Sequence, residues 1–126
     1  MRIWDIDPRL LCRPHLLGEH RELHGLWNIL TRHGGVGGYS AHPETQRWRG
    51  KLAALHARHE ALVEEMTHRG YQHASELDVD LAEGTSAVQD EYIDTPEVQV
   101  GLLLAKRCAC RVTQETEVAH EVCILA

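Results

Sequence analysis

The chain has 126 residues and a mass of 14.3 kDa, the size of a single domain. Hydrophobic residues make up 43% and charged residues 25%, a composition typical of a folded protein that needs no disulfides to form a core. The longest apolar run, Leu102–Ala105, is far shorter than the roughly 20 residues that span a membrane. The beginning of the sequence also lacks the apolar region of a secretory signal, so we expect a cytoplasmic protein with no membrane partner.

Charge is unevenly distributed along the chain. The net charge of −6 is a poor match for a protein that binds duplex nucleic acid without specificity. Residues 1–70, however, hold 10 Lys+Arg against 8 Asp+Glu, whereas residues 71–126 hold 3 against 11. We expect one domain over 1–126, with a helical core at 1–72 and an acidic segment at 73–126. The core can carry a basic working surface, although its charge does not demand one.

Hydrophobic periodicity predicts three helices and little or no sheet. The first helix begins at Arg13-Pro14, where proline suits the first turn, and stops at Gly34-Gly35. Its apolar stripe consists of Leu16, Leu23, Trp27 and Leu30.

The second helix is expected to run unbroken for about seven turns, from Pro43 to a glycine cap at Gly70. The third begins at Asp94 or Thr95 and ends near Lys106. The predicted fold is therefore a compact all-α domain of three main helices, with a long second helix and an irregular C-terminal segment.

One face of the first predicted helix places an acidic and an imidazole side chain beside two glycines. At about 100° per residue, His15, Gly18, Glu22 and Gly25 share a stripe beside the apolar one, and Arg21 lies at its rim. Two small residues beside an acid and an imidazole leave room for a ligand to approach the backbone. The simpler interpretation is a solvated helix face with incidental glycines.

Residues before and within the first two predicted helices resemble those of a known family. The positions concerned are Arg2-Ile3, His15-Leu16, Glu19–Leu23, Gly38–Thr45, Lys51-Leu52, Glu60, Glu64-Glu65 and Arg69–Tyr71. Over about residues 1–72 this pattern resembles the pyrimidine-dimer DNA glycosylases of the phage UV-endonuclease type. The resemblance implies a DNA repair glycosylase with associated β-lyase (AP lyase) activity on UV-induced cyclobutane pyrimidine dimers. Its partner would be damaged double-stranded DNA, and it needs no cofactor.

In that family the nucleophile is the α-amine of the N-terminal residue, which attacks C1′ of the damaged nucleotide and forms an imine. The matching position is Met1, and an α-amine has an ordinary pKa of about 7.7–8.0, so part of it is neutral at working pH. The resemblance makes Glu22 the acid needed for strand breakage by β-elimination. It makes Arg2 and Arg21 phosphate contacts, and His15 a residue that orients the sugar.

Further DNA contacts are expected at the start of the second helix. His42 lies at a helix N-terminus, which favours an anion, although it is equally suited to capping the helix. Arg47, Arg49 and Lys51 follow as candidate phosphate contacts. Trp27 and Trp48 are interpreted as core residues because both lie in apolar stripes.

Two departures from the family pattern leave the lesion open. Gly25 stands where the family has an arginine, and an acidic segment that contains cysteines replaces a basic aromatic tail. One alternative is therefore an AP lyase or glycosylase for another base lesion. A second alternative, from a different class, is a non-catalytic helical module that binds metal or protein. We expect a monomer in either case.

Cysteines and histidines suggest metal binding. Cys108, Cys110, His120 and Cys123 form a possible zinc set, although a C-x-C pair is tighter than the usual spacing and reduced thiols are the simpler interpretation. Glu65-x-x-His68 matches only half of a di-metal motif. His59 lies in an apolar stripe and is interpreted as a packed core histidine.

Overall fold

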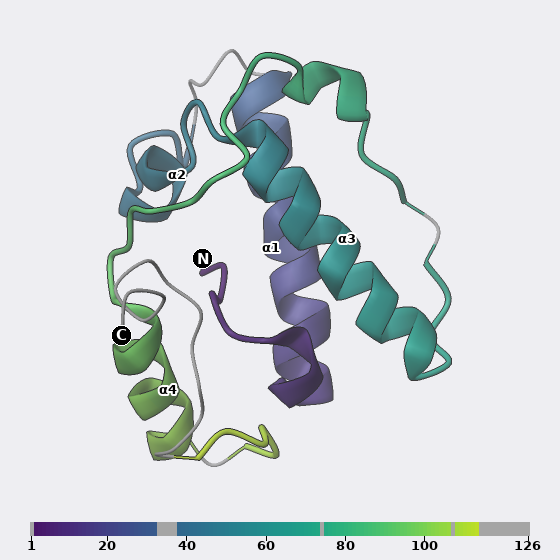
Figure 1. The fold of residues 1–126 in the computed structure, drawn as a ribbon, viewed down its shortest axis with the longest axis vertical. Helices are drawn as coiled ribbons and strands as arrows, with labels where there is room; N and C mark the ends of the chain where they lie inside the picture. Colours follow the sequence, from purple (N-terminus) through teal and green to yellow (C-terminus); the bar gives the residue numbers. More distant parts are fainter. Residues whose placement is uncertain (1, 33–37, 74, 107, 114–126) are drawn as a thin grey trace.

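The computed structural model describes residues 2–32, 38–73, 75–106 and 108–113, and in these it contains helices and no strands. Figure 1 shows the elements, which are η1 (Pro8–Leu10), α1 (Arg13–Thr31), α2 (Pro43–Arg47), α3 (Leu52–His68), η2 (Val79–Ala82) and α4 (Pro96–Ala105). The all-α fold is confirmed, and α1, α3 and α4 are its three main helices. No helix within the described ranges has the length and apolar character that crossing a membrane requires.

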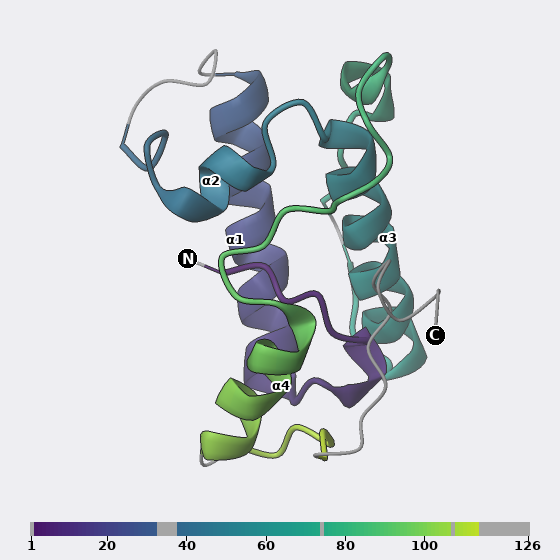
Figure 2. The same ribbon diagram turned by 60° about the vertical axis from the view of Figure 1, so that its left-hand side comes forward.

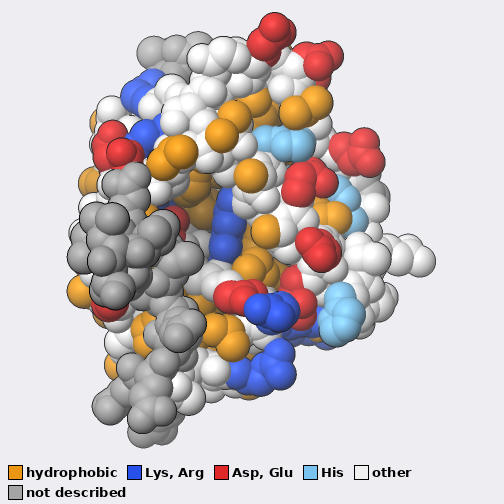
Figure 3. Space-filling view, viewed as in Figure 1, with side chains coloured by type: hydrophobic (Ala, Val, Ile, Leu, Met, Phe, Trp, Pro, Cys, Tyr) orange, Lys and Arg blue, Asp and Glu red, His pale blue; other side chains and the backbone are white. Residues whose placement is uncertain are grey.

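The core forms where α1 and α3 pack together, running in opposite directions (Figures 1 and 2). Leucines on the facing sides of the two helices are completely buried: Leu16, Leu23, Leu26, Leu55 and Leu62. Trp27 and Trp48 are also buried, as predicted. In Figure 3, acidic and histidine side chains gather on the outer surface over α3, so this helix is amphipathic.

The predicted second helix is broken, which corrects the expectation of seven continuous turns. α2 ends at Arg47 and α3 begins at Leu52. Gly50 adopts a φ of 73°, a left-handed conformation that interrupts a right-handed helix. Its carbonyl accepts a hydrogen bond from the backbone N–H of Ser86 at 2.9 Å. The turn is therefore held by the segment after η2, a tertiary contact that helical periodicity does not reveal.

Two of the predicted helix caps agree with the structure. Gly70, with a φ of 83°, follows the last turn of α3, and the N–H of Tyr71 donates to the carbonyl of Met66 at 2.8 Å. This is the Schellman arrangement expected of a glycine at this position. Thr95 is the N-cap of α4, where its Oγ1 accepts from the N–H of Val98.

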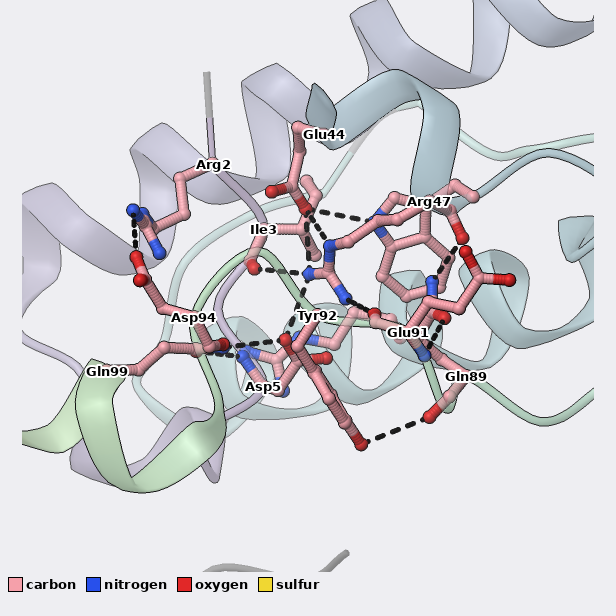
Figure 4. A network of polar contacts seen from close by, with 12 residues as sticks. Arg2, Ile3, Asp5, Glu44, Arg47, Gln89, Glu91, Tyr92, Asp94 and Gln99 are labelled. Carbon is pink, nitrogen blue, oxygen red and sulfur yellow. Dashed lines mark hydrogen bonds and ion pairs between the residues drawn. The ribbon is translucent and has the colours of Figure 1, made fainter. Parts of the chain in front are cut away.

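A buried guanidinium joins segments that are far apart in the sequence (Figure 4). The side chain of Arg47 is only 5% exposed. It donates to the Glu44 carboxylate at 2.7 Å, and to the Ile3 carbonyl, the Asp5 carboxylate and the Glu91 carbonyl at 2.9 Å each. Arg47 therefore fixes α2, the N-terminal segment and the segment before α4 relative to one another.

The same network continues into α4. The buried side chain of Gln99 accepts from the Asp5 N–H at 2.7 Å and donates to the Asp5 carboxylate at 2.9 Å. Arg2 forms an ion pair with Asp94 at 2.9 Å, just before α4 begins. These contacts hold the first residues of the chain between α1 and α4.

Replacing the guanidinium tests this role. Arg47→Met should lower the free energy of unfolding by about 3–5 kcal/mol, because it leaves the Glu44 and Asp5 carboxylates without their buried partner. Arg49→Met, at an exposed neighbouring position, should change it by less than about 1 kcal/mol. Urea unfolding of both variants measures the difference, and equal effects would contradict the structural role of Arg47.

Candidate functional site

A cleft of about 430 Å³ opens between the N-terminal segment, α1 and the end of α4. Arg2 and Trp4 line it from the N-terminal segment, and Leu102 and Lys106 line it from the α4 side. From α1 it is lined by His15, Gly18, Glu19 and Glu22. Three members of the predicted stripe, His15, Gly18 and Glu22, therefore do lie around one hollow together with Arg2. Gly25 does not line the cleft.

Two carboxylates of α1 border the cleft, and they differ in environment. Glu19 is buried, and the guanidinium of Arg58 in α3 donates to its two carboxylate oxygens at 2.6 and 2.9 Å. Arg58 also donates to the Ile6 carbonyl at 2.8 Å. Burial raises the pKa of the Glu19 carboxyl above its ordinary value, and the Arg58 guanidinium opposes this rise. Glu22, one turn further along, is exposed. Glu19 thus connects α1 to α3, and Glu22 is the carboxylate that a bound molecule can reach.

Basic groups flank Glu22 on two sides of the cleft. Arg2 stacks over the Trp4 ring, with 5.1 Å between its guanidinium carbon and the ring centroid, while it pairs with Asp94. Lys106 is exposed at the opposite wall. Arg21 is exposed on α1 beside Glu22 in the sequence but does not line the cleft. These charges suit a phosphate-bearing ligand that approaches Glu22.

His15 faces sulfur atoms. Its Nδ1 lies 3.1 Å from Sγ of Cys12 and 3.3 Å from Sγ of Cys110, and its ring contacts Trp4 edge-on. Burial lowers the pKa of His15, and the nearby Lys106 charge adds to this. Both effects therefore favour the neutral form of this imidazole at the rim of the cleft.

The remaining predicted contacts take mostly structural positions. Nδ1 of His42 caps α2 by accepting from the Glu44 N–H at 3.0 Å. Lys51 is buried and bonded to Gln89 at 2.8 Å and to Glu91 at 3.0 Å. The expectation that Lys51 contacts phosphate does not fit this placement.

The same correction applies to Arg47, whose guanidinium is committed to the internal network described above. Arg49 is exposed, and it donates to the Ser40 carbonyl at 3.0 Å. Of the predicted basic contacts of this region, Arg49 is the one whose charge lies at the surface.

Met1, His120 and Cys123 lie outside the described residues. Cys108 and Cys110, the other half of the predicted zinc set, lie beside Cys12 and His15. Sequence reasoning missed the roles of Trp4, Lys106 and the Glu19–Arg58 pair, because each depends on contacts between distant segments. It also missed a group of four histidines, His20, His24, His59 and His73, whose ligand atoms lie within 4.8 Å of one another.

Comparison with known proteins identifies the family. The model of the family described as pyrimidine dimer DNA glycosylase matches residues 1–79, more than half of the chain. No curated protein and no solved structure matches this chain significantly. The matched region includes the N-terminal segment, α1, α2 and α3, and thus most of the cleft lining. The chain therefore belongs to the pyrimidine dimer DNA glycosylase family.

Proposed function

We propose that this DNA repair glycosylase also has β-lyase activity and acts through an imine at the α-amine of Met1. The observation that carries the proposal is that one cleft is lined both by Arg2, the residue bonded to Met1, and by Glu22 of α1. Amine and carboxylate are the two groups that the reaction needs. The proposal thus rests on family membership and on this juxtaposition.

The reaction is written as two linked steps. The neutral amine attacks C1′ and the bond from C1′ to the base breaks, so that its electron pair leaves with the base, which takes up the proton that the amine nitrogen loses. The bond from C1′ to the ring oxygen O4′ then breaks, O4′ takes up a proton from water, and a protonated imine remains between the amine nitrogen and C1′. A carboxylate then accepts a proton from C2′, and the electron pair released expels the phosphate-bearing oxygen from C3′, which breaks the strand. We assign the proton transfer to Glu22 because its carboxylate is exposed at the cleft, whereas Glu19 is held by Arg58.

The chain offers few other amines for such an imine. It has two lysines, and Lys51 is buried among acceptors. Lys106 lines the cleft and is therefore the competing nucleophile. The α-amine is favoured because its ordinary pKa of about 7.7–8.0 lies well below that of lysine, about 10.4.

The proposed substrate is the cyclobutane pyrimidine dimer in duplex DNA. A base within a duplex has to leave the stack before its C1′ can be attacked, and the cost is lower for a damaged pair. Arg2 and Lys106 line the cleft and Arg21 is exposed on α1, and we assign all three as phosphate contacts, so binding should weaken as salt increases. Because Gly25 departs from the family pattern, an abasic site or another lesion is the alternative substrate.

Trapping with borohydride tests the imine and its acid together. Duplexes with one abasic site or one thymine dimer are incubated with protein that begins at Met1, reduced and resolved on a denaturing gel. A covalent band is expected on both duplexes, and acetylation of the N-terminus should remove it. Glu22→Gln should slow strand cleavage by at least about 100-fold, because general base catalysis is lost.

Glu64→Gln is the matched control, since Glu64 is exposed on α3 and does not line this cleft. A band on the abasic duplex alone would move the lesion assignment to another base. A folded protein without a band on either duplex would overturn the imine mechanism. It would favour the helical binding module, for which the two groups of metal-ligand side chains are the specific observation.

Filling the cleft provides a second prediction. A Cβ added at Gly18 or at Gly25 meets nothing within 4 Å, so a side chain can leave the backbone there without a clash. Because leucine has a higher helix propensity than glycine, each replacement should add up to about 1 kcal/mol of stability. Gly18→Leu places its side chain in the cleft and should slow strand cleavage by at least about tenfold. Gly25→Leu should leave cleavage nearly unchanged. Similar rates for the two variants would show that the reaction occurs elsewhere.

A further inference from the structure

Three cysteines and one histidine converge at the beginning of α1. Cys12 is the N-cap of α1 and His15 lies in its first turn, whereas Cys108 and Cys110 follow α4. One ligand atom from each lies within 4.8 Å of the others. The Nδ1–Sγ distances of 3.1 and 3.3 Å from His15 approach the separation of about 3.5 Å that neighbouring N and S ligands have around a tetrahedral zinc ion. The four side chains are therefore already close to the arrangement that a zinc ion requires.

Hydrogen bonding among these side chains favours a shared cation. Nδ1 of a neutral imidazole carries either one proton or one lone pair, so in His15 it cannot serve two thiols equally well. The backbone N–H of Cys12 points at Sγ of Cys110 with an N–S distance of 3.1 Å, a contact typical of the second shell of a thiolate ligand. Cys12 is also the N-cap of α1, where the positive end of the helix dipole stabilises a thiolate.

We propose that Cys12, His15, Cys108 and Cys110 bind one zinc ion. Four protein ligands close the coordination sphere, which is the arrangement of a structural site. The ion would fasten the segment after α4 to the start of α1, and the two segments already meet there, where the N–H of Arg111 donates to the Leu10 carbonyl at 2.7 Å. Because α4 supplies one wall of the cleft, the zinc would also hold that wall in place.

This site changes two sequence-based expectations. His15 becomes a metal ligand that supports the cleft rather than a contact to the sugar. The C-x-C pair remains a zinc ligand pair, but its partners come from the other end of the chain.

Metal analysis of the full chain tests the proposal. The protein is purified under reducing conditions, and zinc is measured by mass spectrometry of the metal. Cys12→Ser and Cys108→Ser should each bind about one zinc fewer per chain than the wild type. Cys123→Ser is the matched control and should keep the full zinc content. Loss of zinc in Cys123→Ser with retention in Cys12→Ser would overturn the proposal in favour of the set predicted from the C-terminal sequence.

Cobalt substitution separates loss of a ligand from loss of the fold. Cys108 is exposed, so its replacement by serine leaves the core intact. Co²⁺ bound by three thiolates gives strong sulfur-to-metal absorption, which should weaken in Cys108→Ser. Absence of this absorption in the wild type, or its persistence unchanged in Cys108→Ser, would contradict the site.

Four histidines form a second, independent group between α1 and α3. His20 and His24 lie one turn apart on α1, His59 lies on α3, and His73 follows α3. Nε2 of His24 is 3.2 Å from Nε2 of His20 and 3.1 Å from Nε2 of His59. Four nitrogens around a tetrahedral zinc ion with Zn–N bonds of about 2.0–2.1 Å lie about 3.3 Å apart. These two nitrogen separations thus match those around a metal ion, and the four ligand atoms all lie within 4.8 Å of one another.

Four neutral imidazole rings do not have the protons and lone pairs in the right places to satisfy all the contacts in this group. Nε2 of His24 holds one proton or one lone pair and yet faces two other Nε2 atoms. Nε2 of His73 is buried and has no hydrogen-bond partner. A metal ion that accepts one lone pair from each ring removes this conflict.

The geometry points to a second metal site, in which His20, His24, His59 and His73 bind one divalent transition-metal ion. Imidazole nitrogens suit Zn²⁺, Cu²⁺ and Ni²⁺. The Glu60 carboxylate lies 3.0 Å from Nδ1 of His59, as expected of a group that orients a histidine ligand from its far side. The ion would join α1 to α3 from within, beside the leucine core.

Zinc content again provides the test. His73→Gln removes a ligand outside the helices and should bind about one zinc fewer per chain, and the double variant with Cys108→Ser should bind almost none. His68→Gln is the control, since its side chain is 83% exposed on α3, and it should keep the wild-type content. Equal zinc content in His73→Gln and wild type would overturn this second site without affecting the first. The zinc measurements involve no DNA and no imine. Each metal site is therefore tested independently of the proposed function.

Discussion

The fold depends on one buried charge. The guanidinium of Arg47 holds acceptors from α2, the N-terminal segment and the segment before α4, and its own charge is compensated by Glu44 and Asp5. A buried cation is tolerated only when it is paired and hydrogen-bonded in this way, so the segments have little freedom to rearrange. Through Asp5 the network also fixes Gln99 of α4. The N-terminal segment is thus held between α1 and α4, and all three elements line the cleft.

Helix α1 serves the core, the cleft and both proposed metal sites at once. Its leucines face α3, Glu22 faces the cleft, and His24 faces the four-histidine group. Helical geometry permits this division, because residues three or four apart share a face. In this arrangement the metals would hold α1 in position, while Glu22 remains exposed for chemistry. The cysteine-bearing segment after α4 would then contribute to a DNA repair enzyme by holding the wall of the cleft.

Local sequence signals predicted the all-α class, the start of α1, the cap at Gly70 and a cap at Asp94 or Thr95, because periodicity and capping depend on neighbouring residues. The grouping of Glu22 with Arg2 followed from the family resemblance. The break at Gly50 could not be predicted, since it is held by Ser86 in a distant segment. The basic contacts were harder to predict, because burial cannot be read from the local sequence. An arginine near a helix start suggests a phosphate contact, and nothing in the neighbouring residues shows that Arg47 is enclosed. The histidine group was missed for the same reason, because its members come from three separate segments.

The central claim is that the α-amine of Met1 forms the bond to the damaged strand. Peptide mapping of the borohydride-reduced complex locates this bond directly. The account predicts that the sugar remnant is attached to the peptide that begins with Met1, and that Lys106→Arg still yields the adduct. A remnant attached to Lys106, the lysine that lines the same cleft, would contradict the account and assign the nucleophile to the end of α4.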